Sequence, residues 1–198
     1  MADLECATCA YHVCRDGIDC FKMAERVQEL YRSAGPATMK LMRTAAKIEA
    51  EGYRRWPRAE EIIRFAKEAG FTHLGVAFCI GLHEEANTYV ELLEKHFRVS
   101  SVCCKVCGVG KDEFDLKRLH PEHESETMCS PLGQAELLNE AGTEFNIVMG
   151  LCVGHDALFY KHSKAPVTTL IAKDRVMAHN PTGALYSGYW NKKLGDGA

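Results

Sequence analysis

The sequence predicts an α/β fold in which an open, mostly parallel sheet of about four strands is flanked by helices. After residue 70, short and near-continuously apolar runs alternate with segments of helical spacing. Such runs are typical of strands that are buried on both faces and connected by helices. The length of 198 residues fits one domain of this kind with a small appendage.

The predicted organisation has two parts, a cysteine-rich knuckle at residues 1–21 and a single α/β domain at residues 22–198. The domain begins with a helical lead-in at residues 22–70, where apolar residues recur at helical spacing and Gly70 suits a helix end. The sheet core is predicted at residues 71–198.

Four apolar runs predict the strands of the core. They cover residues 72–80, 99–106, 145–153 and 167–172. Two helices are predicted between them, at residues 82–97 and from Ser130-Pro131 to Gly142, with the serine as N-cap and the proline in the first turn. The polar and charged segment at residues 111–128 is predicted to be a long surface excursion.

Composition excludes several classes of protein. A net charge of -3 gives no polybasic field for nucleic acids or anionic membranes. No apolar run approaches the roughly 20 residues that span a bilayer. The first residues carry neither a basic nor an apolar targeting region, so we expect a cytoplasmic protein. Ten cysteines in a reducing compartment indicate metal or redox chemistry instead of disulfides.

The strongest motif is the C-x2-C-x4-C-x5-C spacing of Cys6, Cys9, Cys14 and Cys20. A C-x2-C pair lets two thiolates reach one metal from a tight turn, and the next two cysteines complete a four-sulfur set. The segment has too little apolar mass to bury four cysteines. We therefore expect these four residues to bind a metal.

Zinc and an iron–sulfur cluster both stay open for this site. Zinc ribbons usually separate their two pairs by a dozen or more residues. The compact spacing here is shared with iron–sulfur loops, and the C-x2-C-x4-C-R stretch from Cys6 to Arg15 resembles the cubane-binding segment of carbon monoxide dehydrogenases. A [4Fe-4S] cluster is therefore slightly favoured over zinc.

A second group of cysteines follows the predicted strands. In open parallel sheets, ligand sites form at the carboxyl ends of the strands, so these thiols are expected to converge there. We assign cofactor binding to Cys79, Cys104 and Cys107, and catalysis to Cys129, Cys152 and His155. Together they would form a second metal or cluster site, or a pocket of reactive cysteines.

The assigned roles follow from local position. Cys129 precedes a helix start, where the helix dipole favours a thiolate, and either Cys129 or Cys152 would be the nucleophile or cluster ligand. His155 would carry a proton. The opposing interpretation is that cysteine fills strands as a small apolar residue. Cys103 and Cys104 also point to opposite faces of an extended strand, so both cannot enter one site without a bulge.

Several segments together resemble a prokaryotic family of uncharacterised cysteine-rich metal-binding proteins, a domain-of-unknown-function family. They are the N-terminal cysteine motif and residues 102–106, 129–142, 150–156, 164–175 and 179–181. The resemblance extends over nearly the whole chain. It implies metal binding and no particular activity.

The sequence therefore predicts a metal-binding protein with an N-terminal four-cysteine centre and a second, cysteine-lined site for redox or sulfur-transfer chemistry. Two alternatives stay open: a non-enzymatic metal or redox sensor or carrier, and a small-ligand-binding module stapled by zinc. The expected partner is an unidentified small molecule or redox partner.

Overall fold

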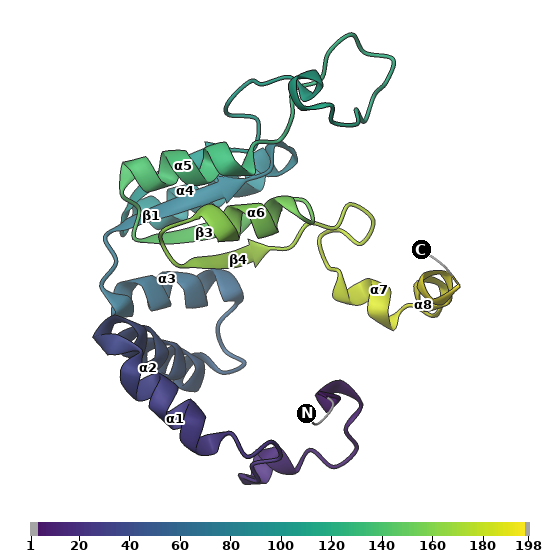
Figure 1. Ribbon diagram of the computed structural model, residues 1–198. Coiled ribbons are helices and arrows are strands. Elements are labelled where there is room, and N and C mark those ends of the chain that lie inside the picture. The colour runs from purple at the N-terminus through teal and green to yellow at the C-terminus, as the bar shows by residue number, and fades with distance from the viewer. Residues whose placement is uncertain (1–3, 197–198) are drawn as a thin grey trace. The chain divides into compact units, whose positions relative to one another are not determined.

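The computed structural model describes residues 4–196 (Figure 1). The chain forms two compact units, residues 1–53 and 54–198. The predicted helical lead-in is therefore shared between the units, with two of its helices in the first and one in the second.

The first unit contains two short 3-10 turns and two helices. The turns are Cys6–Thr8 and Val13–Asp16, and the helices are α1 (Ala24–Ser33) and α2 (Gly35–Gly52). Pro36 lies in the first turn of α2, where its missing N–H costs no helical hydrogen bond.

The second unit confirms the α/β prediction. Its sheet contains the strands β1 (His73–Phe78), β2 (Arg98–Cys103), β3 (Phe145–Met149) and β4 (Val167–Ile171). All neighbouring strands pair in parallel, in the order β2-β1-β3-β4. The chain leaves β1 toward β2 on one side, whereas β3 and β4 lie on the other. The carboxyl ends of β1 and β3 therefore flank a topological switch point, where open α/β sheets bind ligands.

Helices cover both faces of this sheet. Helices α3 (Arg58–Ala69) and α4 (His83–Glu94) pack on one face through Ala66 and Leu93. Helices α5 (Pro131–Ala141) and α6 (His155–His162) pack on the other through Leu138 and Phe159 (Figure 1). β1 and β3 are buried along their whole length because both faces are covered.

Every predicted strand is shorter in the structure, and each loses residues at its carboxyl end. The predicted strand at residues 99–106 becomes β2, which ends at Cys103, and residues 104–107 form turns. β2 is only partly buried since it lies at the sheet edge. An apolar run marks burial and not extended backbone, so it continues past the point where the strand ends.

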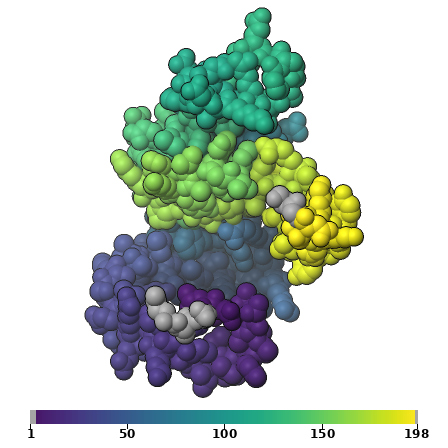
Figure 2. Space-filling model, turned by 45° about the vertical axis from the view of Figure 1, so that its right-hand side comes forward, coloured from purple at the N-terminus to yellow at the C-terminus, as the bar shows by residue number. Residues whose placement is uncertain are grey.

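The second unit also contains segments without a predicted counterpart. Ile80–Leu82 and Lys111–Phe114 are 3-10 turns, and α7 (Thr182–Tyr186) and α8 (Gly188–Gly195) follow the sheet. The predicted excursion projects from the rest of this unit (teal in Figures 1 and 2). Within residues 4–196, no helix combines the length and apolar character needed to cross a membrane.

Candidate functional site

The four N-terminal cysteines lie in a segment with little packing of its own. From residue 4 to residue 22 no side chain is buried, and Cys9 alone is half-buried. Cys6 begins the first 3-10 turn and Cys14 lies within the second. His12 has a φ of 49°, in the left-handed region, which reverses the chain between the two turns.

These four cysteines line one cavity of about 480 Å³, together with His12 and Asp19. Backbone hydrogen bonds from His12 and Tyr11 lower the pKa of Cys9, because an N–H donor stabilises the thiolate form. The cavity therefore presents four thiols, one of them with a lowered pKa.

A second set of cysteines gathers at the carboxyl edge of the sheet. Cys79 directly follows β1, Cys104 directly follows β2, and Cys152 lies three residues beyond β3. Cys129 precedes Ser130, the N-cap of α5, whose hydroxyl accepts a hydrogen bond from the Gly133 N–H. The Ser130 N–H donates to the Cys104 carbonyl at 2.7 Å, which holds Cys129 beside the end of β2.

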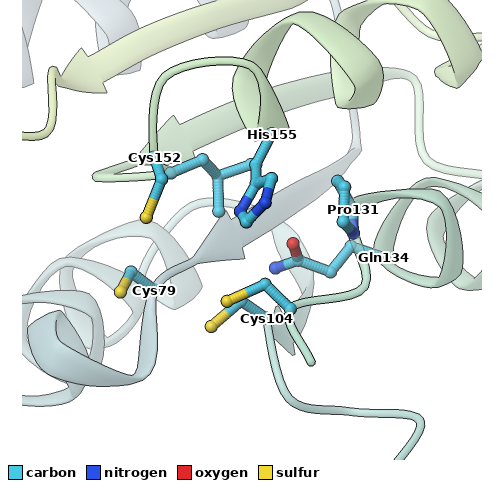
Figure 3. Close-up of a pocket in the computed structure, with 8 residues that line it drawn as sticks. Cys79, Cys104, Pro131, Gln134, Cys152 and His155 are labelled. Carbon is cyan, nitrogen blue, oxygen red and sulfur yellow. The ribbon is translucent and has the colours of Figure 1, made fainter. Parts of the chain in front are cut away.

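One enclosed pocket contains all of these thiols. It is lined by Cys79, Cys104, Cys129, Pro131, Gln134, Leu151, Cys152 and His155. Figure 3 shows the thiols of Cys79, Cys104 and Cys152 around the same space, with the His155 ring on its other side. Five of the six residues that the sequence assigned to this edge are thus brought together, and Cys107 is the exception.

The central thiol of the pocket is Cys104. Its thiol lies beside the sulfurs of Cys79 and Cys129, and its interaction with them lowers the pKa of both residues. Those two interactions and burial raise the pKa of Cys104 itself. The pocket therefore holds a protonated thiol between two sulfurs that favour the anionic form.

Positive charges support the two anionic sulfurs. The Cys104 hydrogen bond, the backbone of Gly81 and the Lys173 ammonium lower the pKa of Cys79 to about 4, against the effect of burial. The Cys104 hydrogen bond and the charges of Lys105 and His155 lower the pKa of Cys129 to about 5.

Two of the basic residues contact sulfur directly. Lys173 Nζ donates to Cys79 Sγ at 3.3 Å, and Arg175 Nη2 donates to Cys152 Sγ at 3.0 Å. The contact with Cys152 raises the pKa of Arg175. Sequence reasoning missed both residues, although they follow β4, and the rule that located the cysteines also applies to this strand.

Gln134 was also missed, because nothing in its local sequence separates it from a surface glutamine. Its side chain is fully buried, and Nε2 donates to the carbonyls of Phe78 at 3.2 Å and Val102 at 2.7 Å. Its Oε1 has no hydrogen-bond partner among the described residues. In Figure 3 the amide lies between the His155 ring and Cys104.

Two further cysteines lie outside the pocket. Cys107 is exposed and lies against the first turn of α5, where a Cβ built on Gly133 would lie 2.4 Å from Cys107 Sγ. Cys103 is half-buried, and its sulfur accepts a hydrogen bond from the Lys105 N–H at 3.5 Å. The predicted cofactor role of Cys107 therefore has no support from its position.

Comparisons with known proteins confirm the predicted membership of a family of unknown function and do not test metal binding. Residues 18–170 match the model of a family described as "Protein of unknown function (DUF1847)". The chain is 48% identical over 195 residues to "Uncharacterized protein MJ0455" of Methanocaldococcus jannaschii, with 98% of this chain and 100% of the relative covered. No solved structure matches. With about three quarters of its residues in the family match and a full-length relative, this chain belongs to the DUF1847 family.

Proposed function

We propose that the protein is a metal-binding protein with a four-cysteine centre near its N-terminus, a [4Fe-4S] cluster in preference to zinc. The carboxyl edge of the sheet would hold a second, cysteine-lined site for redox or sulfur-transfer chemistry. The observation that carries the proposal is that Cys6, Cys9, Cys14 and Cys20 line one cavity in a segment without a buried residue.

The high exposure of residues 4–22 supports the proposal that a bound metal orders this segment. Leu4 and Tyr11 are 83% and 85% exposed, and Ile18 is 58% exposed. Apolar burial is the main favourable term in folding, and this segment obtains little of it. Metal binding by several thiolates contributes roughly 10–16 kcal/mol in small metal-bound domains, which is enough to hold a segment of this length.

The choice of a cluster over zinc rests on the sequence spacing of the four cysteines. All four lie between residues 6 and 20, a compactness shared with iron–sulfur loops, whereas zinc ribbons usually separate their two pairs by a dozen or more residues.

The electrostatic environment at the carboxyl edge of the sheet supports thiol chemistry there. Two sulfurs, those of Cys79 and Cys129, favour the thiolate, which is the nucleophile and the metal ligand among the forms of cysteine. Cys129 or Cys152 would act as nucleophile or ligand, and His155 would carry the proton. Ten free thiols suit a reducing compartment, so we place the protein in the cytoplasm.

Metal and sulfide analysis of protein purified without oxygen tests the N-terminal centre. We expect brown protein, and Cys9→Ser or Cys20→Ser should lose iron, sulfide and visible absorption in proportion. Cys107→Ser is the matched control, because this cysteine is exposed and lines neither cavity. Colourless protein with one zinc per chain would refute the cluster. Metal content that the N-terminal variants leave unchanged would refute the centre altogether.

One observation favours a carrier as second candidate. Cys6, Cys14 and Cys20 are exposed, so a chelator or an acceptor protein has direct access to a metal held there. A carrier should transfer its metal to a chelator within minutes, whereas a resident centre should keep it. The rate of metal transfer to a coloured chelator separates these two functions.

A further inference from the structure

We infer that Cys79, Cys104, Cys129 and Cys152 are the ligands of a second metal centre at the carboxyl edge of the sheet, separate from the N-terminal one. The inference deepens the proposed function and rests on it, because it gives the second site a chemical identity. It assigns these four thiols to metal binding and leaves Cys103 and Cys107 out.

Four separate segments deliver the thiols to one place. Cys79 follows β1, Cys104 follows β2, Cys152 follows β3 and Cys129 precedes α5, and all four line the same pocket. A nucleophilic site needs one activated thiol, with a second to resolve a disulfide. Four thiols at one switch point exceed that need and equal the ligand set of a thiolate-bound metal.

The charges around the pocket argue against cysteines that merely fill space. A buried structural cysteine is neutral and needs no cation. Here Lys173 donates to Cys79 at 3.3 Å and Arg175 donates to Cys152 at 3.0 Å, and the charge of Lys105 acts on Cys129. Such cations offset the negative charge that several thiolates bring to a metal centre.

The donor set selects the class of metal. Among the described residues that line the pocket there is no carboxylate, and the metal-ligating types are cysteine and one histidine. Thiolate-rich sets bind zinc, copper(I) and iron–sulfur clusters, whereas magnesium and calcium prefer oxygen. The donor set therefore suits a single thiophilic ion, and the enclosed space between the thiols is too small for a larger group.

The size of the pocket excludes a small organic substrate between the thiols. About 190 Å³ of space separates the lining atoms, and none of it is roomy enough for a water molecule. A metal atom lies about 2.3 Å from a thiolate sulfur, far inside the distance of a non-bonded contact. A single metal ion bound by thiolates can thus occupy a site that is closed to solvent.

The Gln134 amide is an independent sign of a missing ligand. Its Nε2 is bound to the carbonyls of Phe78 and Val102, which can only accept, so Oε1 must face the other way. This fully buried oxygen has no hydrogen-bond partner among the described residues. An unpartnered oxygen buried among the lining residues indicates that the described residues alone do not complete this site.

The test separates the two centres by substitution. A variant with Cys6, Cys9, Cys14 and Cys20 all changed to Ser should keep metal bound to the sheet edge, whereas the iron and sulfide of the N-terminal cluster should be lost. Adding Cys104→Ser should lower the remaining metal at least about tenfold, since even second-shell losses cost 10–100-fold in affinity. Adding Cys103→Ser instead is the matched control and should leave the metal in place.

A second measurement does not depend on how the variants fold. In wild-type protein, bound metal should protect the half-buried Cys129 and Cys152 together from alkylation, as read by mass spectrometry. Removal of the metal should make both of them reactive, while exposed Cys107 reacts in both states.

The outcomes distinguish the inference from the proposed function. The second centre would be overturned if the four-fold N-terminal variant contained no metal and if metal removal did not change the alkylation of the sheet-edge thiols. That result would leave the N-terminal centre supported. Full wild-type metal content in that variant would overturn the N-terminal centre and support the one at the sheet edge.

Discussion

At the scale of single residues, Gln134 ties helix α5 to two strands. Its Nε2 donates to the Phe78 carbonyl of β1 and the Val102 carbonyl of β2, and its side chain is fully buried. Phe78 directly precedes the pocket residue Cys79, and Val102 lies two residues before the pocket residue Cys104. The residue therefore fixes the strand ends that present the thiols.

We expect Gln134→Leu to lower the free energy of unfolding by about 1–3 kcal/mol, because it removes the donors while leaving buried acceptors behind. Urea denaturation followed by circular dichroism measures the change. Glu136→Gln on the exposed face of the same helix is the control and should have no effect. Equal stability of Gln134→Leu and wild type would show that the amide does not hold these strand ends.

At the scale of elements, β1 and β3 can pair closely because Gly75 faces Asn146. A Cβ at position 75 would lie 2.0 Å from Asn146 Oδ1 and 3.0 Å from Leu138 Cδ1. Asn146 cannot move aside easily, since it accepts from Thr143 Oγ1 at 2.8 Å and donates to Ser163 Oγ at 2.9 Å.

Gly75→Ala should therefore destabilise the sheet by about 1–3 kcal/mol or more, as over-packed cores do. The shift of the urea midpoint measures it. Gly110→Ala supplies the contrast, because no atom lies within 4 Å of its built Cβ and its φ of −73° suits any residue. A Gly75→Ala protein as stable as Gly110→Ala would contradict the close contact.

Glu126 holds together the surface excursion between β2 and α5. Its carboxylate pairs with Lys111 at 2.7 Å and accepts from the Leu119 N–H at 2.6 Å. The Lys111 hydrogen bond and the backbone donors lower the pKa of Glu126 to about 2. The surface excursion that charge alone predicted is thus ordered near its two ends, where Lys111 and Glu126 form an ion pair.

The ionised Glu126 should stabilise the excursion above the unfolded pKa of about 4.3, and the contribution should fade as the pH falls through about 2. We expect Glu126→Gln to speed hydrogen exchange in residues 108–128 near neutral pH, with the difference from wild type shrinking in acid. Exposed Glu124→Gln is the matched control. A difference that grows toward acid pH would contradict this assignment.

At the scale of the whole molecule, the two units differ in what can stabilise them. The sheet unit has a core on each face, including residues such as Leu74, Ile147 and Phe159 that are fully buried. Residues 4–22 have none. The order of this segment should thus depend on its metal, while the order of the sheet unit should not.

Trypsin tests that difference. The variant with all four N-terminal cysteines changed to Ser should be cut at Arg15 and Lys22 much faster than wild type, whereas residues 54–196 stay resistant and their thermal transition is unchanged. Wild-type protein is the reference, and Cys107→Ser should behave like it. Equal cutting of the variant and wild type would mean that something other than the metal orders the segment.

Much of the fold follows from local pattern. Four apolar runs predicted four strands, and the helices between them required a parallel sheet, as observed. Strand ends were predicted too long, because the apolar run continues into Cys79, Cys104 and Leu151 after the backbone has turned. Those are the residues that line the pocket, so the error and the site share one cause.

The sequence by itself determined the α/β class, the N-terminal cysteine motif and the expectation that thiols gather at one edge of the sheet. Only the tertiary structure decided which thiols meet. Cys103 and Cys104 are adjacent residues of the same type, and the turn after β2 places Cys104 in the pocket and Cys103 outside it. Lys173 reaches Cys79 from 94 residues away. Local pattern sets burial and backbone shape, whereas the contacts that create a site depend on strand order and side-chain direction, which only the assembled sheet defines.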